Sequence, residues 1–212
     1  MRKIVKVAIV FAVLMLAATG AYAWDVVYDA STGLLPTEAS PEWQLFGGGV
    51  MPTISEGLLR IQGNDANYAY YLREAWAIEA GVSVTMEARM RVEENSSRAP
   101  TMLIQTTDRS ITLNVYGDYI QAYDWASMSY ISFYSDFTTL QTIRMAYDGE
   151  TKAYVWVNDQ LALEWALSYS SGNYKGIGFG SYWYGAFDSY WEYVAYSKEF
   201  LPVVPSLLRS RH

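Results

Sequence analysis

Apolar and polar residues alternate strictly over residues 82–92. Side chains on a β-strand point alternately to opposite faces of the sheet, so this pattern predicts one long strand with a buried face and a solvent-exposed face. The apolar positions are Val82, Val84, Met86, Ala88, Met90 and Val92, and the polar positions between them are Ser83, Thr85, Glu87, Arg89 and Arg91.

Shorter segments with the same character follow one another along the chain, separated by turn residues. Helical periodicity is weak everywhere, and only residues 74–80 could form a helical turn. Asp148-Gly149 predicts a tight hairpin and Asn158-Asp159 a second turn. The pattern therefore predicts an all-β, two-sheet antiparallel β-sandwich or jelly roll. The remaining predicted strands cover residues 25–29, 43–46, 57–62, 68–72, 101–106, 110–116, 119–124, 128–134, 140–147, 152–157, 160–167, 175–181 and 189–197.

The first residues have the features of an export signal. Three cations precede an uncharged apolar stretch over residues 7–18, and alanines follow at positions 21 and 23. We expect a signal peptide over residues 1–23, cleaved before Trp24. The stretch is shorter than the roughly 20 residues of a membrane-spanning helix, which favours removal over the alternative, a retained anchor. The sequence thus predicts a secreted or periplasmic protein, with a sandwich domain over residues 24–200 and a flexible tail over 201–212.

The composition of the chain excludes several kinds of catalytic site and disfavours some classes of binding partner. The chain has no cysteine and one histidine, His212, so a Cys nucleophile, a His-ligated zinc site and a Ser-His-Asp triad each lack a required residue. Loss of the three signal cations takes the formal charge from −7 to −10. Such a surface repels nucleic acid and anionic lipid. We expect a monomer that meets a neutral glycan or a cell-surface protein.

Two segments resemble concanavalin A-like (laminin G-like) jelly rolls. Residues 147–159 are similar to the penultimate hairpin of that superfamily, and residues 187–197, preceded by Ile177-Gly178-Phe179-Gly180, are similar to its last strand. The start of the chain, Tyr28-Asp29 and residues 35–43, fits bacterial exported members. The resemblance implies two antiparallel sheets, one of them concave, with the first and last strands adjacent. Members bind sugars, cleave polysaccharides or mediate contacts, so the fold does not choose the function.

Carboxylates suited to glycoside hydrolysis are not evident. That reaction needs two carboxylates facing each other across the bond, and the Glu-x-Asp-x-x-Glu run of the glucanase branch is absent. Glu87, Glu164 and Glu192 each stand singly on a predicted strand, which favours pairing with an Arg or Tyr over catalysis. A non-catalytic protein is therefore favoured. A hydrolase with a carboxylate pair unrecognisable from sequence, and a structural or adhesive envelope protein without a small ligand, remain the alternatives.

Aromatic side chains offer the best candidate binding surface. Sugar rings stack on Tyr and Trp through their C–H faces, while amide and carboxylate groups bond their hydroxyls. Tyr119, Gln121 and Tyr123 share one face of a predicted strand, with Tyr130 on the next strand. Most rings in such a sandwich are core or cross-strand partners, which is the competing interpretation. The predicted stacking residues are Tyr182, Trp183, Tyr184, Trp125 and Tyr123, and the predicted polar contacts are Gln121 and Asp124.

Two aspartates and a run of alternating glycines are the remaining candidate features. The resemblance implies a calcium ion (Ca²⁺) near the first and last strands, where Asp29 and Asp188 would supply oxygen ligands. Surface acids that merely end strands are the alternative, and no other cofactor is expected. Glycines 176, 178 and 180 alternate on one predicted strand, unlike a dinucleotide-binding loop. We expect a neighbouring side chain to lie across their bare face.

Overall fold

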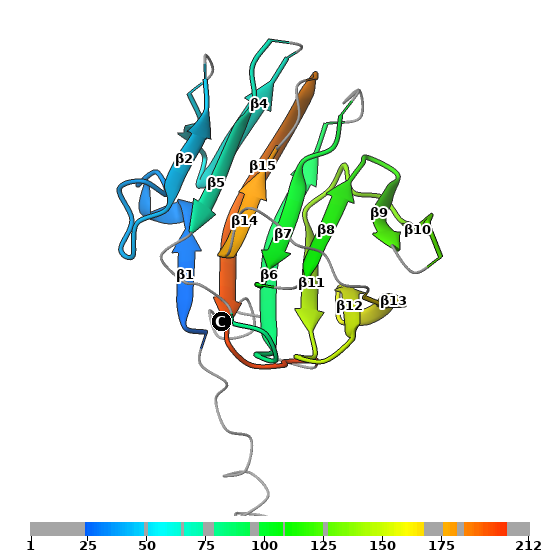
Figure 1. Ribbon diagram of the computed structural model, residues 1–212. Helices are drawn as coiled ribbons and strands as arrows, with labels where there is room; N and C mark the ends of the chain where they lie inside the picture. Colours follow the sequence, from blue (N-terminus) through cyan, green and yellow to red (C-terminus); the bar gives the residue numbers. More distant parts are fainter. Residues whose placement is uncertain are drawn as a thin grey trace, which may run out of the picture. The chain divides into compact units, whose positions relative to one another are not determined.

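Two antiparallel β-sheets packed face to face make up the computed structural model of the protein (Figure 1). The structure describes residues 24–48, 51–64, 66–73, 79–93, 98–107, 109–124, 127–167, 176–181 and 185–202. The predicted all-β antiparallel sandwich is confirmed. Residues 1–23, where the signal peptide is predicted, lie outside the described ranges. Within those ranges no helix has the length and apolar character needed to cross a membrane.

One sheet has eight strands, in the order β13-β12-β11-β6-β15-β4-β3, with β1 paired to β15 outside this path. Its strands are β1 (Val26–Asp29), β3 (Thr53–Ser55), β4 (Leu58–Gly63), β6 (Val84–Val92), β11 (Gln141–Tyr147), β12 (Lys152–Val157), β13 (Gln160–Ala166) and β15 (Phe187–Ser197).

The other sheet has seven strands, in the order β10-β9-β8-β7-β14-β5-β2. Its strands are β2 (Gln44–Gly47), β5 (Ala69–Arg73), β7 (Thr101–Gln105), β8 (Ser110–Val115), β9 (Tyr119–Asp124), β10 (Ser129–Tyr134) and β14 (Gly176–Gly180). A short 3-10 helix, η1 (Ala30–Thr32), follows β1.

The long final strand β15 joins the two ends of the described chain. Its first half pairs with β4, its second half pairs with β1, and β6 runs along its other side. The first and last strands are therefore adjacent, as the resemblance implied. A register shift between Trp191 and Tyr193 places both Trp191 and Val194 in the core. This bulge lets one strand serve two different partners without exposing its apolar residues.

The predicted strands are present with ends displaced by at most two residues. The three-residue strand β3 was missed because it is too short to show a period. Asn158 and Asp159 form a two-residue hairpin turn in which both residues have positive φ, 49° and 66°, as in a type I′ turn. Asp148-Gly149 instead begins a four-residue connection, in which the Asp148 carboxylate accepts bonds from three backbone N–H groups.

Aromatic rings fill the space between the sheets around Phe179 of β14. The Phe179 ring lies 5.1 Å from Trp43, 5.1 Å from Trp191 and 5.3 Å from Tyr71, centroid to centroid. All four side chains are fully buried. Rings at these spacings contribute edge and stacking attraction in addition to the free energy of burial. They hold together strands from both sheets and the segment that precedes β2.

The polar face of β6 is partly buried, which corrects the prediction of a solvent-exposed face. Thr85 and Glu87 are both 0% exposed. The chain after β15 crosses this face: the Leu201 N–H donates to Thr85 Oγ1 (2.9 Å), which donates to the Glu199 carbonyl (2.7 Å). Leu201, assigned from sequence to the flexible tail, is 1% exposed, and the sandwich extends at least to residue 202.

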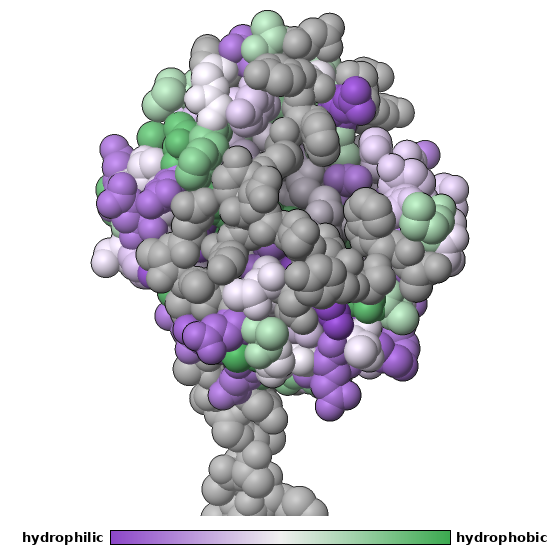
Figure 2. Space-filling model, viewed as in Figure 1, coloured by the Kyte–Doolittle hydropathy of each residue, from purple (hydrophilic) through white to green (hydrophobic). Residues whose placement is uncertain are grey.

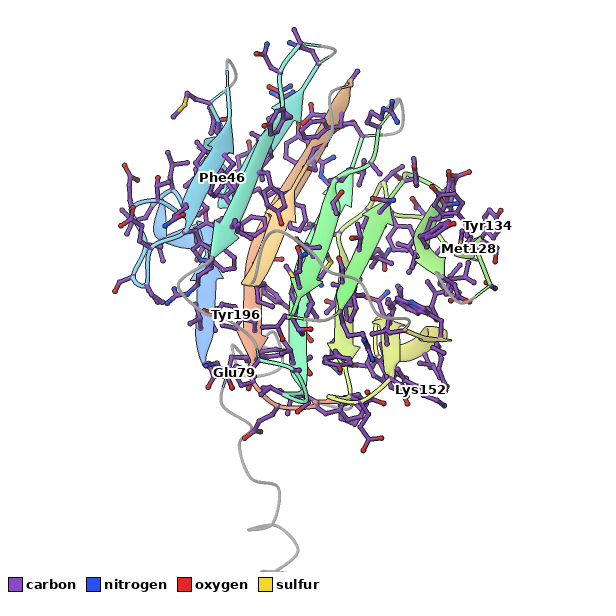
Figure 3. All side chains as sticks on the ribbon, in the orientation of Figure 1. Phe46, Glu79, Met128, Tyr134, Lys152 and Tyr196 are labelled. Atoms are coloured by element: carbon purple, nitrogen blue, oxygen red, sulfur yellow. The ribbon has the colours of Figure 1, made fainter. Side chains whose placement is uncertain are left out.

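A tyrosine ring covers the bare face of β14. Gly178 pairs with Leu72 on β5, and a methyl group built on Gly178 would overlap the phenol of Tyr70. The predicted side chain across the bare face is therefore Tyr70 at Gly178, whereas Gly180 faces the backbone of Ala69 and Tyr70. Tyr70, Leu72 and Leu103 form a small buried apolar cluster, with Phe46 of β2 packed against it. Phe46 is labelled in Figure 3, at the edge of the sheet opposite to β10.

Replacement of Gly178 tests this packing. Gly178→Ala should lower the free energy of unfolding by about 1–3 kcal/mol, because the added methyl group collides with the Tyr70 ring. In a Tyr70→Leu background the same change should cost much less, as urea denaturation of the four variants would show. Gly48→Ala is the matched control, since nothing lies within 4 Å of its added methyl group. Equal losses at both glycines would contradict the overlap.

The buried tyrosines predict cooperative alkaline unfolding. Burial raises the pKa of Tyr196 from 10.0 to about 12 and raises the pKa of Tyr28, Tyr71 and Tyr193 further. A folded pKa above the unfolded one stabilises the fold below pH 10, and this contribution disappears as the pH rises towards the folded values. Ionisation of these four tyrosines, followed by tyrosinate absorbance, should therefore coincide with loss of the far-ultraviolet circular dichroism signal above pH 10. Gradual ionisation of every tyrosine with an unchanged circular dichroism spectrum would refute this.

Candidate ligand-binding face

Four polar side chains form a row across the outer face of the seven-stranded sheet. The register pairs Thr101 of β7 with Asn114 of β8, Asn114 with Gln121 of β9, and Gln121 with Ser132 of β10. Thr101 Oγ1 donates to Asn114 Oδ1 (3.2 Å), and Gln121 Nε2 donates to Ser132 Oγ (3.3 Å). Strand alternation places these residues on one face because their neighbours on each strand are in the core. The two amides therefore have their positions fixed by cross-strand partners.

Tyrosines flank this polar row on both sides. On one side Tyr123 of β9 faces Tyr130 of β10, with ring centroids 5.0 Å apart and planes at 70°. On the other side Tyr119 stacks on Tyr116 at 4.4 Å and lies 5.6 Å from Tyr134. Tyr130 is 61% exposed and Tyr134 is 74% exposed. Large rings this open to solvent are unusual and available for contact with a ligand.

The tyrosines lie at the free edge of the sheet. Met128 and Tyr134 are labelled beside β9 and β10 in Figure 3. In the space-filling view from the same side, the surface at this edge is mostly pale, the colour of intermediate hydropathy, rather than deep purple (Figure 2). Such a surface combines apolar ring faces with hydrogen-bonding groups.

A cavity of about 390 Å³ opens between these side chains. Its size falls within the range of small-molecule sites. None of the described residues that line it is acidic, and one of them is a cation. They are Arg98, Ala99, Asn114, Tyr116, Gln121 and Tyr130.

The structure brings together part of the set predicted from sequence. Tyr123 and Gln121 share the outer face, as expected. Asp124, next to Tyr123, alternates to the other face at the end of β9, where its carboxylate accepts a bond from Ser127 Oγ (2.6 Å). Trp125, Tyr182, Trp183 and Tyr184 lie outside the described residues. Gly185, which follows them, lies against the Arg98 side chain, so the described end of that segment adjoins the cavity.

Sequence reasoning missed four of the described lining residues, namely Arg98, Ala99, Asn114 and Tyr116. The alternation of Thr112 and Asn114 with core residues was a usable signal for Asn114. Nothing in the sequence indicated that β7 and β9 would place their residues on either side of it. Arg98 precedes its strand and has no periodic pattern at all.

The two aspartates considered for calcium do not come together. Asp29 accepts a bond from the Ser31 N–H at the start of η1 and faces Tyr193 on β15. Asp188 lies five residues before Tyr193 on that strand, about 16 Å away at the usual rise per residue. Asp188 binds Arg60 at 2.6 Å. One cation cannot reach both carboxylates, and no group of three acidic or histidine side chains suited to a metal occurs in the described ranges.

The three glutamates considered for catalysis each face a cation on the eight-stranded sheet. Glu164 pairs with Lys152 and Glu192 with Arg89, both at 2.6 Å. Glu87 is buried opposite Arg144. The favoured interpretation, pairing with a basic or tyrosine partner, is confirmed for these residues. Among the described side chains, no two carboxylates face each other across the cavity.

Glu87 and Arg144 form the centre of a buried polar cluster. The Arg144 guanidinium binds Glu87 at 2.6 Å and Asp159 at 3.2 Å, and it donates to the Pro202 carbonyl at 3.3 Å. Tyr193 Oη donates to the other Glu87 oxygen (2.8 Å). Burial raises the pKa of Glu87, while Arg144 and Tyr193 act in the opposite direction. The cluster lies beneath the C-terminal segment, so it fixes that segment rather than meeting a ligand.

Comparison with known proteins supports the fold and no more. No protein-family model matches the sequence, and no curated protein matches it. Among solved structures, the chain is similar to a sialidase (TM-score 0.61, 10% identity, covering 84% of this chain and 18% of that one). It is also similar to the cellulose-induced protein Cip1 (TM-score 0.56, 8% identity, covering 82% and 97%). A third is the binding domain of botulinum neurotoxin DC in complex with SialylT (TM-score 0.52, 11% identity, covering 75% and 43%). The chain thus spans less than half of that toxin domain, and identities this low show the fold alone.

Removal of the Arg144 charge tests the buried cluster. Arg144→Met should lower the free energy of unfolding by about 3–5 kcal/mol, because it leaves Glu87 buried without its counter-charge. Combining it with Glu87→Leu should recover much of the loss, as denaturant titration would show. Lys152→Gln, which breaks an exposed ion pair on the same sheet, serves as control and should leave the unfolding midpoint nearly unchanged. A loss in Arg144→Met no greater than the control's would rule out this role.

Proposed function

We propose that the outer face of β8, β9 and β10 is a non-catalytic glycan-binding site of an exported protein. The observation that carries the proposal is the Tyr123–Tyr130 pair, of which Tyr130 is exposed, beside a cavity lined by the Asn114 and Gln121 amides. A sugar ring presents C–H groups that stack on tyrosine and hydroxyls that bond to amides. Both kinds of group line the same cavity here.

The preferred ligand is a largely neutral polysaccharide or the glycan of a cell-surface partner. The formal charge of −7 disfavours long polyanions through general repulsion. Tyr182, Trp183 and Tyr184 are proposed to extend the platform, because the next residue, Gly185, adjoins the cavity. Two of the solved structures with this fold, a sialidase and a toxin domain in complex with SialylT, support a link between this architecture and sugars.

A binding role is favoured over hydrolysis by the position of the carboxylates. A glycosidase needs an acid and a second carboxylate within about 5–9.5 Å across the scissile bond. The described residues that line the cavity include no carboxylate. A release assay for reducing ends on the same glycans would detect hydrolysis if it occurred.

Removal of one exposed ring tests the proposal. Tyr130→Ala should weaken binding of a glycan identified on a polysaccharide and oligosaccharide panel by about tenfold, since it removes a stacking contact and opens the cavity wall. Titration monitored by tryptophan fluorescence or calorimetry measures the change, with and without EDTA to test the calcium expectation. Tyr190→Ala removes a ring from the other sheet and should leave affinity unchanged. If no glycan on the panel binds, the protein is instead a scaffold or adhesive domain and this proposal fails.

A further inference from the structure

Arg98 is a cation at the cavity for which the described part of the chain supplies no acidic partner. Among the described residues, no ion pair or hydrogen bond of its guanidinium is found. This contrasts with the arginines on the other sheet, which each pair with a carboxylate. They are Arg60 with Asp188, Arg89 with Glu192, Arg91 with Glu93, and Arg144 with Glu87 and Asp159.

The Arg98 side chain is held at its base and exposed at its tip. Its backbone N–H donates to the Ala186 carbonyl (3.0 Å). Its aliphatic stem lies against Gly185, where a methyl group would overlap Cγ. The residue as a whole is exposed. The stem is therefore positioned by packing, while the guanidinium can meet a ligand at the rim of the cavity.

The acidic residue in the turn between β8 and β9 does not pair with Arg98. This residue, Asp118, is exposed, and no ion pair between it and Arg98 is found in the described part of the chain. The other described residues lining the cavity supply amides, phenols and an alanine. A guanidinium in such surroundings offers paired N–H donors that match the geometry of a carboxylate or sulfate.

We infer that Arg98 binds an anionic substituent, a carboxylate or a sulfate ester, carried by an otherwise neutral glycan. This inference rests on the proposed function of the tyrosine face. The net charge of the protein and the local charge of Arg98 act differently on an anionic glycan. The net negative charge repels a chain with an acidic group on every sugar, whereas one anionic group seated at Arg98 is bound locally by charge-assisted hydrogen bonds. The site thus selects a glycan with an isolated acidic group.

The test is an array that presents each oligosaccharide core in matched neutral, carboxylated and sulfated forms. The wild-type protein should bind at least one anionic form about tenfold more tightly than its neutral parent, and raised salt should reduce that preference. The carboxylated and sulfated arms identify which group is recognised. Arg98→Gln should abolish the preference and leave binding of the neutral parent nearly unchanged. Arg98→Lys, which keeps the charge but loses the planar fork, should retain part of it.

The control is Lys152→Gln, which removes the same charge from the other sheet (Figure 3) and should keep the full preference. Equal binding of neutral and anionic forms by the wild type, or a preference that survives in Arg98→Gln, overturns the inference while the glycan-binding proposal stands. Failure to bind any form on the array overturns both.

Discussion

Packing of aromatic rings between the two sheets is the interaction on which the rest of this structure depends. The chain has no cysteine, so no disulfide can hold the layers together. Phe179 instead contacts Trp43, Tyr71 and Trp191, which come from both sheets and from the segment before β2. Burial of such large side chains is the main favourable term in folding, and ring geometry adds specificity. Trp191 also anchors strand β15 in the core, and this strand pairs with β1, β4 and β6.

The outer faces of the two sheets differ in how their polar side chains are used. The eight-stranded sheet uses its outer face for internal contacts, with Glu87 and Arg144 buried under the C-terminal segment and the remaining arginines paired with acids. The β8–β10 end of the seven-stranded sheet has exposed tyrosines, two ordered amides and an arginine that no described carboxylate neutralises. Unsatisfied hydrogen-bonding capacity and open ring faces are gathered at one place. That asymmetry is the reason why we propose binding at this face.

The candidate site is a product of strand pairing. Asn114, Gln121 and Ser132 come from three strands and meet only because the register aligns them in one row. The Tyr123–Tyr130 pair depends on the same hairpin. The contribution of β9 could be predicted, because alternation placed Tyr119, Gln121 and Tyr123 on one face of that strand. Arg98 could not be predicted, since a residue before a strand has no period and its neighbours, Gly185 and Ala186, are distant in the sequence.

The sequence by itself determined the number and position of nearly all strands, because a period of two is a local property of a half-buried strand. It also determined that glycines on β14 would accommodate a neighbouring side chain. Only the tertiary structure decided that Tyr70 is this neighbour, that Thr85 and Glu87 are covered rather than solvated, and that Asp29 and Asp188 are far apart. The reason is physical: alternation specifies two faces of a strand, whereas what covers each face depends on segments that lie far away along the chain.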